Sequence, residues 1–276
     1  MTRIALLQMQ SGTDPEANFA AIAAGAWEAA GEGAETLFTP EMALLLDRDR
    51  KRAARTVASP SYGDYPARFA GLAREAKIDI ALGSMPTVRP SGKFVNRAAY
   101  FAADGCAPVT YDKLHLFDVE LATGESWRES NAYEAGERLG LVENSPVGRL
   151  GLTICYDIRF PALFEVLGRM RCDAIAIPAA FTVPTGTAHW HVLQRARAIE
   201  ASAFVFAAAQ VGRHEDGRET YGHSLVVDPW GEVLLDMGNE RPGLGLCEID
   251  RARIDEVRGQ VPSLANRREI PNLSAS

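Results

Sequence analysis

Short apolar runs alternate with helix-forming stretches along the whole chain, which is the pattern of an α/β protein. The first ten residues form a strand-like apolar run with a single charge. Asp14 and Pro15 then supply a helix N-cap and a first helical residue, and Gly31 and Gly33 end the predicted helix after Ala30.

The same alternation predicts further elements in both halves of the chain. The expected helices span residues 65–77, 161–171 and 187–201. The expected strands span residues 36–38, 78–83, 96–101, 107–111, 174–177, 204–209, 225–227, 233–235 and 245–249. No linker separates the halves, so the pattern predicts one domain over residues 1–276, with sheet layers flanked by helices.

The helix over 187–201 carries apolar side chains at every third position. Trp190, Leu193, Ala196 and Ile199 follow this spacing. We therefore expect these four side chains to form the buried face of the helix.

The charge pattern narrows the range of partners. A formal net charge of -7 with mixed signs leaves no basic stripe, which argues against nucleic acid and anionic membranes. No run approaches the roughly 20 apolar residues needed to span a bilayer, and the first residues resemble a strand rather than a signal peptide. Four scattered cysteines form neither a disulfide framework nor a C-x-x-C metal pair, so we expect a cytoplasmic, reducing location.

Cys155 is the candidate nucleophile, because an apolar run delivers its thiol to a polar break and Pro161 opens the next helix. A thiol with a pKa of about 8.5 is only a few per cent thiolate at neutral pH, so it needs a base and a positive charge. For Cys106, Cys172 and Cys247 we expect the ordinary role of a small buried hydrophobe.

Glu41 and Lys113 follow other strand-like runs in the same way. If these strands belong to one sheet, their carboxyl ends bring the three side chains to the same edge. We expect Glu41 to take the thiol proton and pass it to the leaving nitrogen. We expect Lys113 to lower the thiol pKa and, with the backbone N–H of Tyr156, to stabilise the oxyanion of a tetrahedral intermediate.

Each of these residues also has an ordinary alternative role. Glu41 and Lys113 are solvated surface charges in that interpretation, and Cys155 is a buried apolar group. A Cys–His pair is the competing mechanism, but none of the five histidines has a carboxylate partner obvious from the sequence, and His115 is better interpreted as support for the site. Neither H-E-x-x-H nor paired C-x-x-C occurs, so we expect no metal.

Three segments resemble, in order and spacing, the signature regions of the nitrilase, or carbon-nitrogen hydrolase, superfamily. They are Phe38-Thr39-Pro40-Glu41, the run from Tyr111 to Asp118 and the run from Gly151 to Pro161. The resemblance implies a four-layer αββα sandwich and a Glu-Lys-Cys triad of Glu41, Lys113 and Cys155. Such a triad hydrolyses non-peptide C–N bonds of small-molecule amides through a thioester, without a cofactor.

The resemblance extends from Arg3 to about Arg268 and implies at least a homodimer. The Pro-rich, charged tail from about residue 261 is compatible with packing on a partner subunit.

The family also uses a second glutamate between the lysine and the cysteine. The chain offers Glu120, Glu125, Glu129 and Glu134 there. The resemblance favours Glu129, because Glu129 and the serine after it match the family's Glu-Ser pattern sixteen residues after the lysine. The other three are expected to be loop charges.

Segments 180–190, 195–200, 208–214 and 221–224 look like the Nit branch of this superfamily. That branch contains amidases acting on ω-amides of α-keto acids, namely deaminated glutathione and α-ketoglutaramate, and residues 210–214 favour the former. Such substrates carry carboxylates, which need a cation or a helix N-terminus near the thiol.

The candidate substrate-binding residues are therefore Arg159, Thr185 and His189, with Thr185 and Thr187 at the expected helix start. The alternatives are a surface ion pair for Arg159 and a plain N-cap for either threonine. Arg197 and Glu200 are three residues apart and are suited to an intrahelical or interface pair.

The leading hypothesis is an amidase that forms a thioester at Cys155 and releases ammonia and the free acid from a small carboxylate-bearing ω-amide. Deaminated glutathione is favoured over α-ketoglutaramate. A nitrilase or an N-carbamoyl amidase would use the same residues on other substrates. A catalytically inactive binding or assembly module is the alternative of another class, and three polar groups converging on one edge argue against it.

Overall fold

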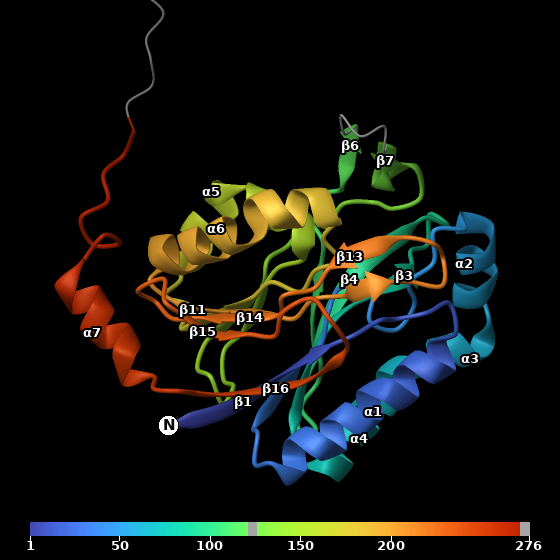
Figure 1. Ribbon diagram of the computed structural model, residues 1–276, viewed down its shortest axis with the longest axis horizontal. Coiled ribbons are helices and arrows are strands. Elements are labelled where there is room, and N and C mark those ends of the chain that lie inside the picture. Colours follow the sequence, from blue (N-terminus) through green and yellow to red (C-terminus); the bar gives the residue numbers. More distant parts are fainter. Residues whose placement is uncertain (121–125, 271–276) are drawn as a thin grey trace, which may run out of the picture.

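The computed structural model describes residues 1–120 and 126–270, which contain two six-stranded sheets packed face to face (Figure 1). The first sheet has the order β16-β1-β2-β3-β4-β5. Its strands are β1 (Thr2–Gln8), β2 (Thr36–Phe38), β3 (Asp79–Val88), β4 (Phe94–Phe101), β5 (Val109–Asp112) and β16 (Gly243–Ile249). Strands β1, β2 and β3 are parallel, whereas β16 and β4 run antiparallel to their neighbours.

The second sheet has the order β15-β14-β11-β10-β9-β8. Its strands are β8 (Gly140–Val142), β9 (Leu150–Leu152), β10 (Ala174–Ala176), β11 (Phe204–Ala207), β14 (Leu225–Val227) and β15 (Val233–Asp236). Two further pairs, β6 (Asp118–Glu120) with β7 (Ser126–Arg128) and β12 (Val211–Arg213) with β13 (Glu219–Tyr221), lie outside the two sheets.

Helices cover the outer face of each sheet. Figure 1 shows α1 (Pro15–Gly31) and α4 (Tyr65–Ala76) on the first sheet, and α5 (Pro161–Arg169) and α6 (Val183–Ala201) on the second. The remaining helices are α2 (Arg50–Val57), α3 (Pro60–Gly63), α7 (Ala252–Gln260) and the 3₁₀ turns η1 (Glu129–Asn131) and η2 (Cys155–Arg159). No helix of the described ranges is both long and apolar enough to cross a membrane.

Two buried apolar clusters hold the layers together. One lies between α1, α4 and the first sheet and includes Ile22 and Phe69. The other fills the space between the sheets and continues under α5 and α6. Across the two sheets, the rings of Phe38 and Phe206 lie 4.8 Å apart between centroids. The expected α/β fold, a four-layer αββα sandwich, is confirmed.

The predicted apolar face of α6 is wrong at Ile199, although Trp190 is buried and Leu193 packs against the core. The buried residues of α6 are Gly186, Trp190, Gln194, Arg197, Ala198 and Ala201, and Ile199 is 49% exposed. Each helical residue adds about 100°, so the nine residues from Trp190 to Ile199 add about 900° and place the two side chains on opposite sides. The helix also begins at Val183 rather than at residue 187, with Thr182 as its N-cap.

The C-terminal tail contacts its own chain over the part that is described. Arg267 lies 3.4 Å from the Glu165 carboxylate of α5, and Leu264 lies beside Gly168. Packing of the tail on a partner subunit stays a prediction.

Candidate active site

The four predicted catalytic side chains meet at one end of the sandwich. Glu41 follows β2, Lys113 follows β5, Glu129 begins η1, and Cys155 follows β9 at the start of η2. Glu41, Lys113 and Cys155 are at most 8% exposed. The simplest sequence interpretation required all of these strands to belong to one sheet. They do not, because β2 and β5 belong to the first sheet and β9 belongs to the second. The site is therefore assembled between the two sheets.

The Lys113 ammonium lies between two carboxylates. Its Nζ is 2.9 Å from Glu41 Oε1 and 3.0 Å from Glu129 Oε2. The backbone N–H of Ala180 donates to Glu41 Oε2 at 3.0 Å, and that of Phe117 donates to Glu129 Oε2 at 2.6 Å. These donors fix both carboxylates, which is the condition for burying charge without a large penalty.

Asn96 is a member of this group that the sequence interpretation missed. Its buried amide donates to Glu41 Oε1 at 2.9 Å and lies 3.4 Å from Glu129 Oε1. Asn96 shares the inner face of β4 with Ala98 and Tyr100, which belong to the core between the sheets. A polar amide in the core-facing register of an apolar strand was the signal that could have found it.

The backbone presents Cys155 in a strained conformation. Its φ is 46°, in the left-handed region that residues other than glycine rarely adopt. Its N–H donates to the Pro178 carbonyl at 2.8 Å, and the preceding N–H of Ile154 donates to Asp157 Oδ2 at 2.9 Å. The N–H of Tyr156 has no acceptor among the described residues, which leaves it available for the predicted oxyanion role.

Asp157 and His115 hold this turn in place through hydrogen bonds. The buried Asp157 carboxylate accepts hydrogen bonds from Tyr111 Oη at 2.7 Å and from the backbone N–H of His115 at 3.1 Å. His115 Nδ1 lies 2.7 Å from the same carboxylate. His115 thus links the segment after Lys113 to the turn that carries Cys155, as the sequence interpretation expected.

Gly83 allows the backbone of β3 to lie close to the segment that carries Glu41. A Cβ at Gly83 would lie 2.1 Å from the Thr39 carbonyl oxygen and 2.4 Å from that of Pro40. Gly83 lies where the β3–β4 register shifts between Leu82 and Met85, an irregularity that bends a strand locally. The segment before Glu41 can therefore pack directly on β3.

The proton of the resting triad lies on sulfur. Burial, and then the negative charge of Glu41, raise the pKa of the Cys155 thiol well above its ordinary value, and Lys113 offsets only part of this. Burial also opposes ionisation of Glu41, but the charge of Lys113 and hydrogen bonds lower the pKa of its carboxyl group. Lys113 lowers the thiol pKa, as expected, but burial and the charge of Glu41 together raise that pKa by more.

Lys113 itself stays protonated. Burial would lower its pKa, but the charges of Glu129 and Glu41 raise that pKa well above the ordinary value. The resting site therefore holds a thiol, a carboxylate and an ammonium group. Glu41 can act as a general base only as the thiol attacks, and Lys113 stays available to stabilise developing negative charge.

Cys155 lies in the wall of a cavity of about 630 Å³. Aromatic rings line much of it, among them Phe117, Trp127, Tyr133, Tyr156 and Phe181. Five arginines also line it, namely Arg48, Arg50, Arg128, Arg159 and Arg218. A cavity that combines aromatic rings with convergent charged side chains is suited to a small charged molecule.

The substrate-binding predictions meet different outcomes. Arg159 and Thr185 line the cavity, and Arg159 forms no ion pair with a carboxylate of the described residues. His189 is exposed and lies outside the cavity wall, where its Nδ1 is 3.2 Å from Arg159 Nη1. Because α6 begins at Val183, Thr185 lies in its first turn and neither Thr185 nor Thr187 is the N-cap.

The sequence interpretation missed the other cavity arginines. The guanidinium carbons of Arg48 and Arg218 each lie 5.3 Å from the centroid of the Trp127 ring. These residues come from segments far apart in the chain, so no local pattern marks them.

Of the alternative loop glutamates, Glu125 lies outside the described residues.

The histidines do not favour a Cys–His pair. The ring nitrogens of His214 contact the Ser11 carbonyl and the Thr220 hydroxyl. His115, His191 and His223 contact aspartates. Among the described residues, no histidine ring nitrogen forms a hydrogen bond with Cys155.

Comparisons of the sequence agree with this geometry. The family model "Carbon-nitrogen hydrolase" matches residues 3–259. A deaminated glutathione amidase from Synechocystis sp. (strain PCC 6803 / GT-S) is 39% identical over 86% of this chain and 87% of its own. A deaminated glutathione amidase from Yersinia enterocolitica is 38% identical over 98% of this chain and 94% of its own.

Solved structures of similar fold include members of the nitrilase superfamily. The NitFhit protein of C. elegans has a TM-score of 0.88 and 37% identity, covering 97% of this chain and 65% of that chain. Saccharomyces cerevisiae Nit3, of branch 10 of the superfamily, has a TM-score of 0.82 and 27% identity over 95% of this chain and 94% of its own. A mutant amidase from Nesterenkonia sp. AN1 carries the acetamide moiety of fluoroacetamide on its active-site cysteine, with a TM-score of 0.80 and 26% identity over 97% and 94% of the two chains.

Proposed function

The chain belongs to the carbon-nitrogen hydrolase family, and from that premise we propose that it is an amidase that hydrolyses the ω-amide bond of deaminated glutathione. The observation that carries this proposal is the buried contact of Lys113 with Glu41 and Glu129 beside the strained Cys155 turn. The names of its relatives and the arginines of the cavity support the choice of substrate.

The first half of the reaction forms a thioester. Cys155 Sγ attacks the amide carbon while Glu41 takes the thiol proton, and Lys113 with the N–H of Tyr156 stabilises the oxyanion. Glu41 then gives the proton to the amide nitrogen, the C–N bond breaks and the amine leaves. For deaminated glutathione that amine is cysteinylglycine rather than the ammonia expected from the sequence. Ammonia is the product only from a primary amide such as α-ketoglutaramate.

The second half returns the enzyme to its resting state. Glu41 takes a proton from a water molecule as the water attacks the thioester carbon. The same oxyanion donors stabilise the second tetrahedral intermediate, and the proton returns to sulfur as the free acid leaves. Glu129 positions Lys113 throughout, because its carboxylate holds the ammonium 3.0 Å away.

The chemistry is tested by trapping the acyl enzyme. Purified protein is mixed with deaminated glutathione, quenched and weighed by intact-mass spectrometry. We expect the mass of one oxodicarboxylic acyl group on the wild-type chain and none on the Cys155→Ala variant, with release of cysteinylglycine abolished as well. Undiminished release by Cys155→Ala would refute the mechanism.

The substrate is tested separately, by comparing turnover of deaminated glutathione, α-ketoglutaramate, a nitrile and an N-carbamoyl amino acid. We expect the highest kcat/KM for deaminated glutathione. A higher value for α-ketoglutaramate identifies an ω-amidase, and a higher value for the nitrile or the carbamoyl compound identifies the corresponding activity on the same triad.

We propose that Arg159 binds a substrate carboxylate, because it lines the cavity without a carboxylate partner of its own in the described part of the chain. For Arg159→Gln we expect kcat/KM to fall about tenfold to a hundredfold, as for loss of a hydrogen bond to a charged group. Arg169→Gln is the control, since Arg169 is exposed in α5. An equal loss on an uncharged ω-amide would contradict carboxylate recognition.

We further propose that the enzyme works in the cytoplasm as a homodimer. All four cysteines are free, which suits a reducing compartment. Val192 and Ile199 of α6 are 67% and 49% exposed and, being seven residues apart, lie on one face of the helix. Light scattering on purified protein is expected to give twice the chain mass, and Val192→Asp to shift it toward the monomer.

A further inference from the structure

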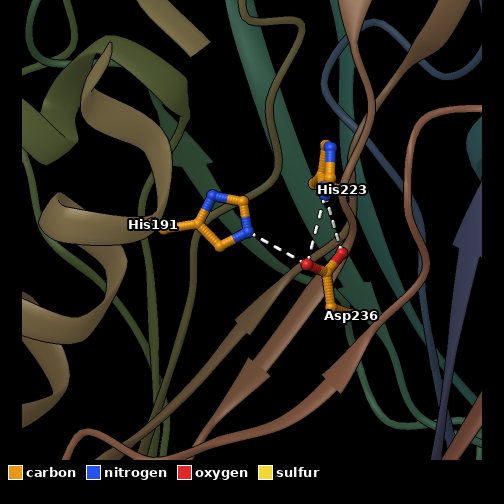
Figure 2. A group of neighbouring side chains, drawn as sticks. All are labelled: His191, His223 and Asp236. Carbon is orange, nitrogen blue, oxygen red and sulfur yellow. Dashed lines mark hydrogen bonds and ion pairs between the residues drawn. The ribbon is translucent and has the colours of Figure 1, made fainter. Parts of the chain in front are cut away.

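Two histidines and an aspartate form a compact cluster outside the cavity wall. His191 comes from α6, His223 from the connection between β13 and β14, and Asp236 from the end of β15. Figure 2 shows both imidazoles directed at the same carboxylate. His191 Nε2 is 3.0 Å from Asp236 Oδ2, and His223 Nδ1 is 2.9 Å from Oδ1 and 3.2 Å from Oδ2.

We propose that His191, His223 and Asp236 bind a divalent transition-metal ion of the zinc class. One ligand atom from each of the three residues lies within 4.8 Å of the others. Zinc binds imidazole nitrogen and carboxylate oxygen at about 2.0–2.2 Å, so neighbouring ligand atoms of a tetrahedral site are about 3.3 Å apart. The two distances to Asp236 Oδ2, 3.0 and 3.2 Å, are close to that value.

The ligands are held by neighbouring groups, as the ligands of metal sites usually are. The N–H of Gly238 donates to Asp236 Oδ1 at 2.9 Å, which fixes the carboxylate. The carbonyl of His223 accepts a hydrogen bond from Trp190 Nε1 at 2.7 Å. The ring of Tyr221 stacks on the His223 ring with centroids 4.5 Å apart.

A hydrogen bond to the Asp236 carboxylate requires a proton on His191 Nε2 and on His223 Nδ1. Each ring moves this proton to its other nitrogen and offers the vacated lone pair to the ion. Asp236 contributes one negative charge, and water completes the coordination, because the side chains of His191 and Asp236 are each 33% exposed.

The site would add a further link between three segments that already share hydrogen bonds. Trp190 of α6 donates to the His223 carbonyl, and the N–H of His223 donates to the Gly238 carbonyl after β15. Tyr221, beside His223, also lies against Gly186 in the first part of α6, where a Cβ would be 2.2 Å from its ring. The start of α6 and β13 line the active-site cavity through Thr185 and Thr220. An ion at this cluster therefore stabilises the wall of the cavity without touching the reacting atoms. The widely separated ligands also explain why no sequence motif reveals it.

The test uses tag-free protein stripped with a chelator and titrated with Co²⁺ and Zn²⁺. The variants are His191→Gln and Asp236→Asn, and His189→Gln, two residues earlier on the same helix, is the matched control. We expect one Co²⁺ per chain with weak visible absorption bands and no strong near-ultraviolet thiolate band, which separates this site from the cysteines. We expect Zn²⁺ to raise the melting temperature by several degrees.

Both signals are expected to remain in His189→Gln and to weaken at least about tenfold in the two cluster variants. Absence of binding to the wild-type chain would mean that the cluster is a hydrogen-bonded group only. Binding that is unchanged in His191→Gln and Asp236→Asn would also overturn the proposal. Circular dichroism of each variant shows that it is folded.

Discussion

The Glu41 carboxylate has two opposing effects on Cys155. It is the group that must remove the thiol proton, and its negative charge is also one cause of the raised thiol pKa. Lys113 cannot reverse this effect, because its ammonium is shared with Glu129. The site therefore keeps a protonated, weakly reactive thiol until an amide carbonyl is present to accept the electrons of sulfur.

This balance predicts a divergent outcome for Glu41→Gln. Turnover of deaminated glutathione is expected to fall by at least about a hundredfold, because general-base catalysis is lost. The thiol pKa is expected to fall, since the charge that raised it is gone while Lys113 remains. Reaction of Cys155 with a neutral disulfide probe at pH 8, followed by peptide mass mapping, is therefore expected to become faster. A slower probe reaction would show that Glu41 does not raise the thiol pKa.

Asn96 predicts a change in pH profile. Asn96→Ala removes a donor from the Glu41 carboxylate, which favours the protonated form and raises the pKa of Glu41. Activity requires the carboxylate, so the acidic limb of kcat/KM is expected to move to higher pH, with a loss of about tenfold to a hundredfold at neutral pH. Asn18→Ala, which removes a buried amide bound to the Gly12 and Leu44 carbonyls, is the control. The same shift in both variants would mean that Asn96 is only structural.

At the scale of elements, sequence patterns predicted structure best where one local signal decided it. Asp14 and Pro15 mark the start of α1, and the Asp14 side chain accepts a hydrogen bond from the N–H of Glu16 as a cap should. The predicted start of α6 is four residues too late. Pro184 lies in the first turn of the helix, where proline is favoured, so Pro184 marks the true start and residue 187 does not. A periodicity of three was mistaken for 3.6, so Ile199 was wrongly assigned to the core.

The candidate site was only partly predictable for a related reason. Glu41, Lys113 and Cys155 each lie within three residues after a strand, which is a local signal. Asn96 and the arginines around Trp127 depend on contacts between distant segments. Glu129 came from the family resemblance alone, because four glutamates in one loop have no local feature that separates them. The pattern of a single strand does not show which sheet that strand joins, so the sequence could not predict that the site lies between two sheets.

Strand β3 provides a prediction about the backbone around Glu41. Gly83→Ala would force a Cβ to within 2.4 Å of two carbonyl oxygens of the Thr39–Pro40 segment, so we expect a loss of stability of about 1–3 kcal/mol. We also expect reduced kcat, because that segment carries Glu41. The control is Gly71→Ala in α4, where nothing lies within 4 Å, and a gain of about 0.5–1 kcal/mol is expected. Denaturant unfolding measures both, and equal stabilities of the two variants would contradict this account.

At the scale of the whole molecule, the site exists only where the two sheets face each other. Glu41 and Lys113 follow strands of the first sheet, and Cys155 follows a strand of the second. The buried cluster between the sheets contains side chains from both, with Phe38 against Phe206 as one contact. Neither sheet alone holds a base, a cation and a nucleophile, so separation of the layers removes the reaction.

This arrangement predicts that activity and global structure are lost together in denaturant. Release of cysteinylglycine, the tryptophan fluorescence and the far-ultraviolet circular dichroism are expected to share one midpoint, because loss of packing between the layers separates the triad and exposes the buried Trp190. The titration is repeated at two protein concentrations. A higher midpoint at the higher concentration is expected if the protein is a homodimer, since association stabilises the folded chain by mass action. Loss of activity well before the change in circular dichroism would instead show that the site opens locally while the two sheets stay packed.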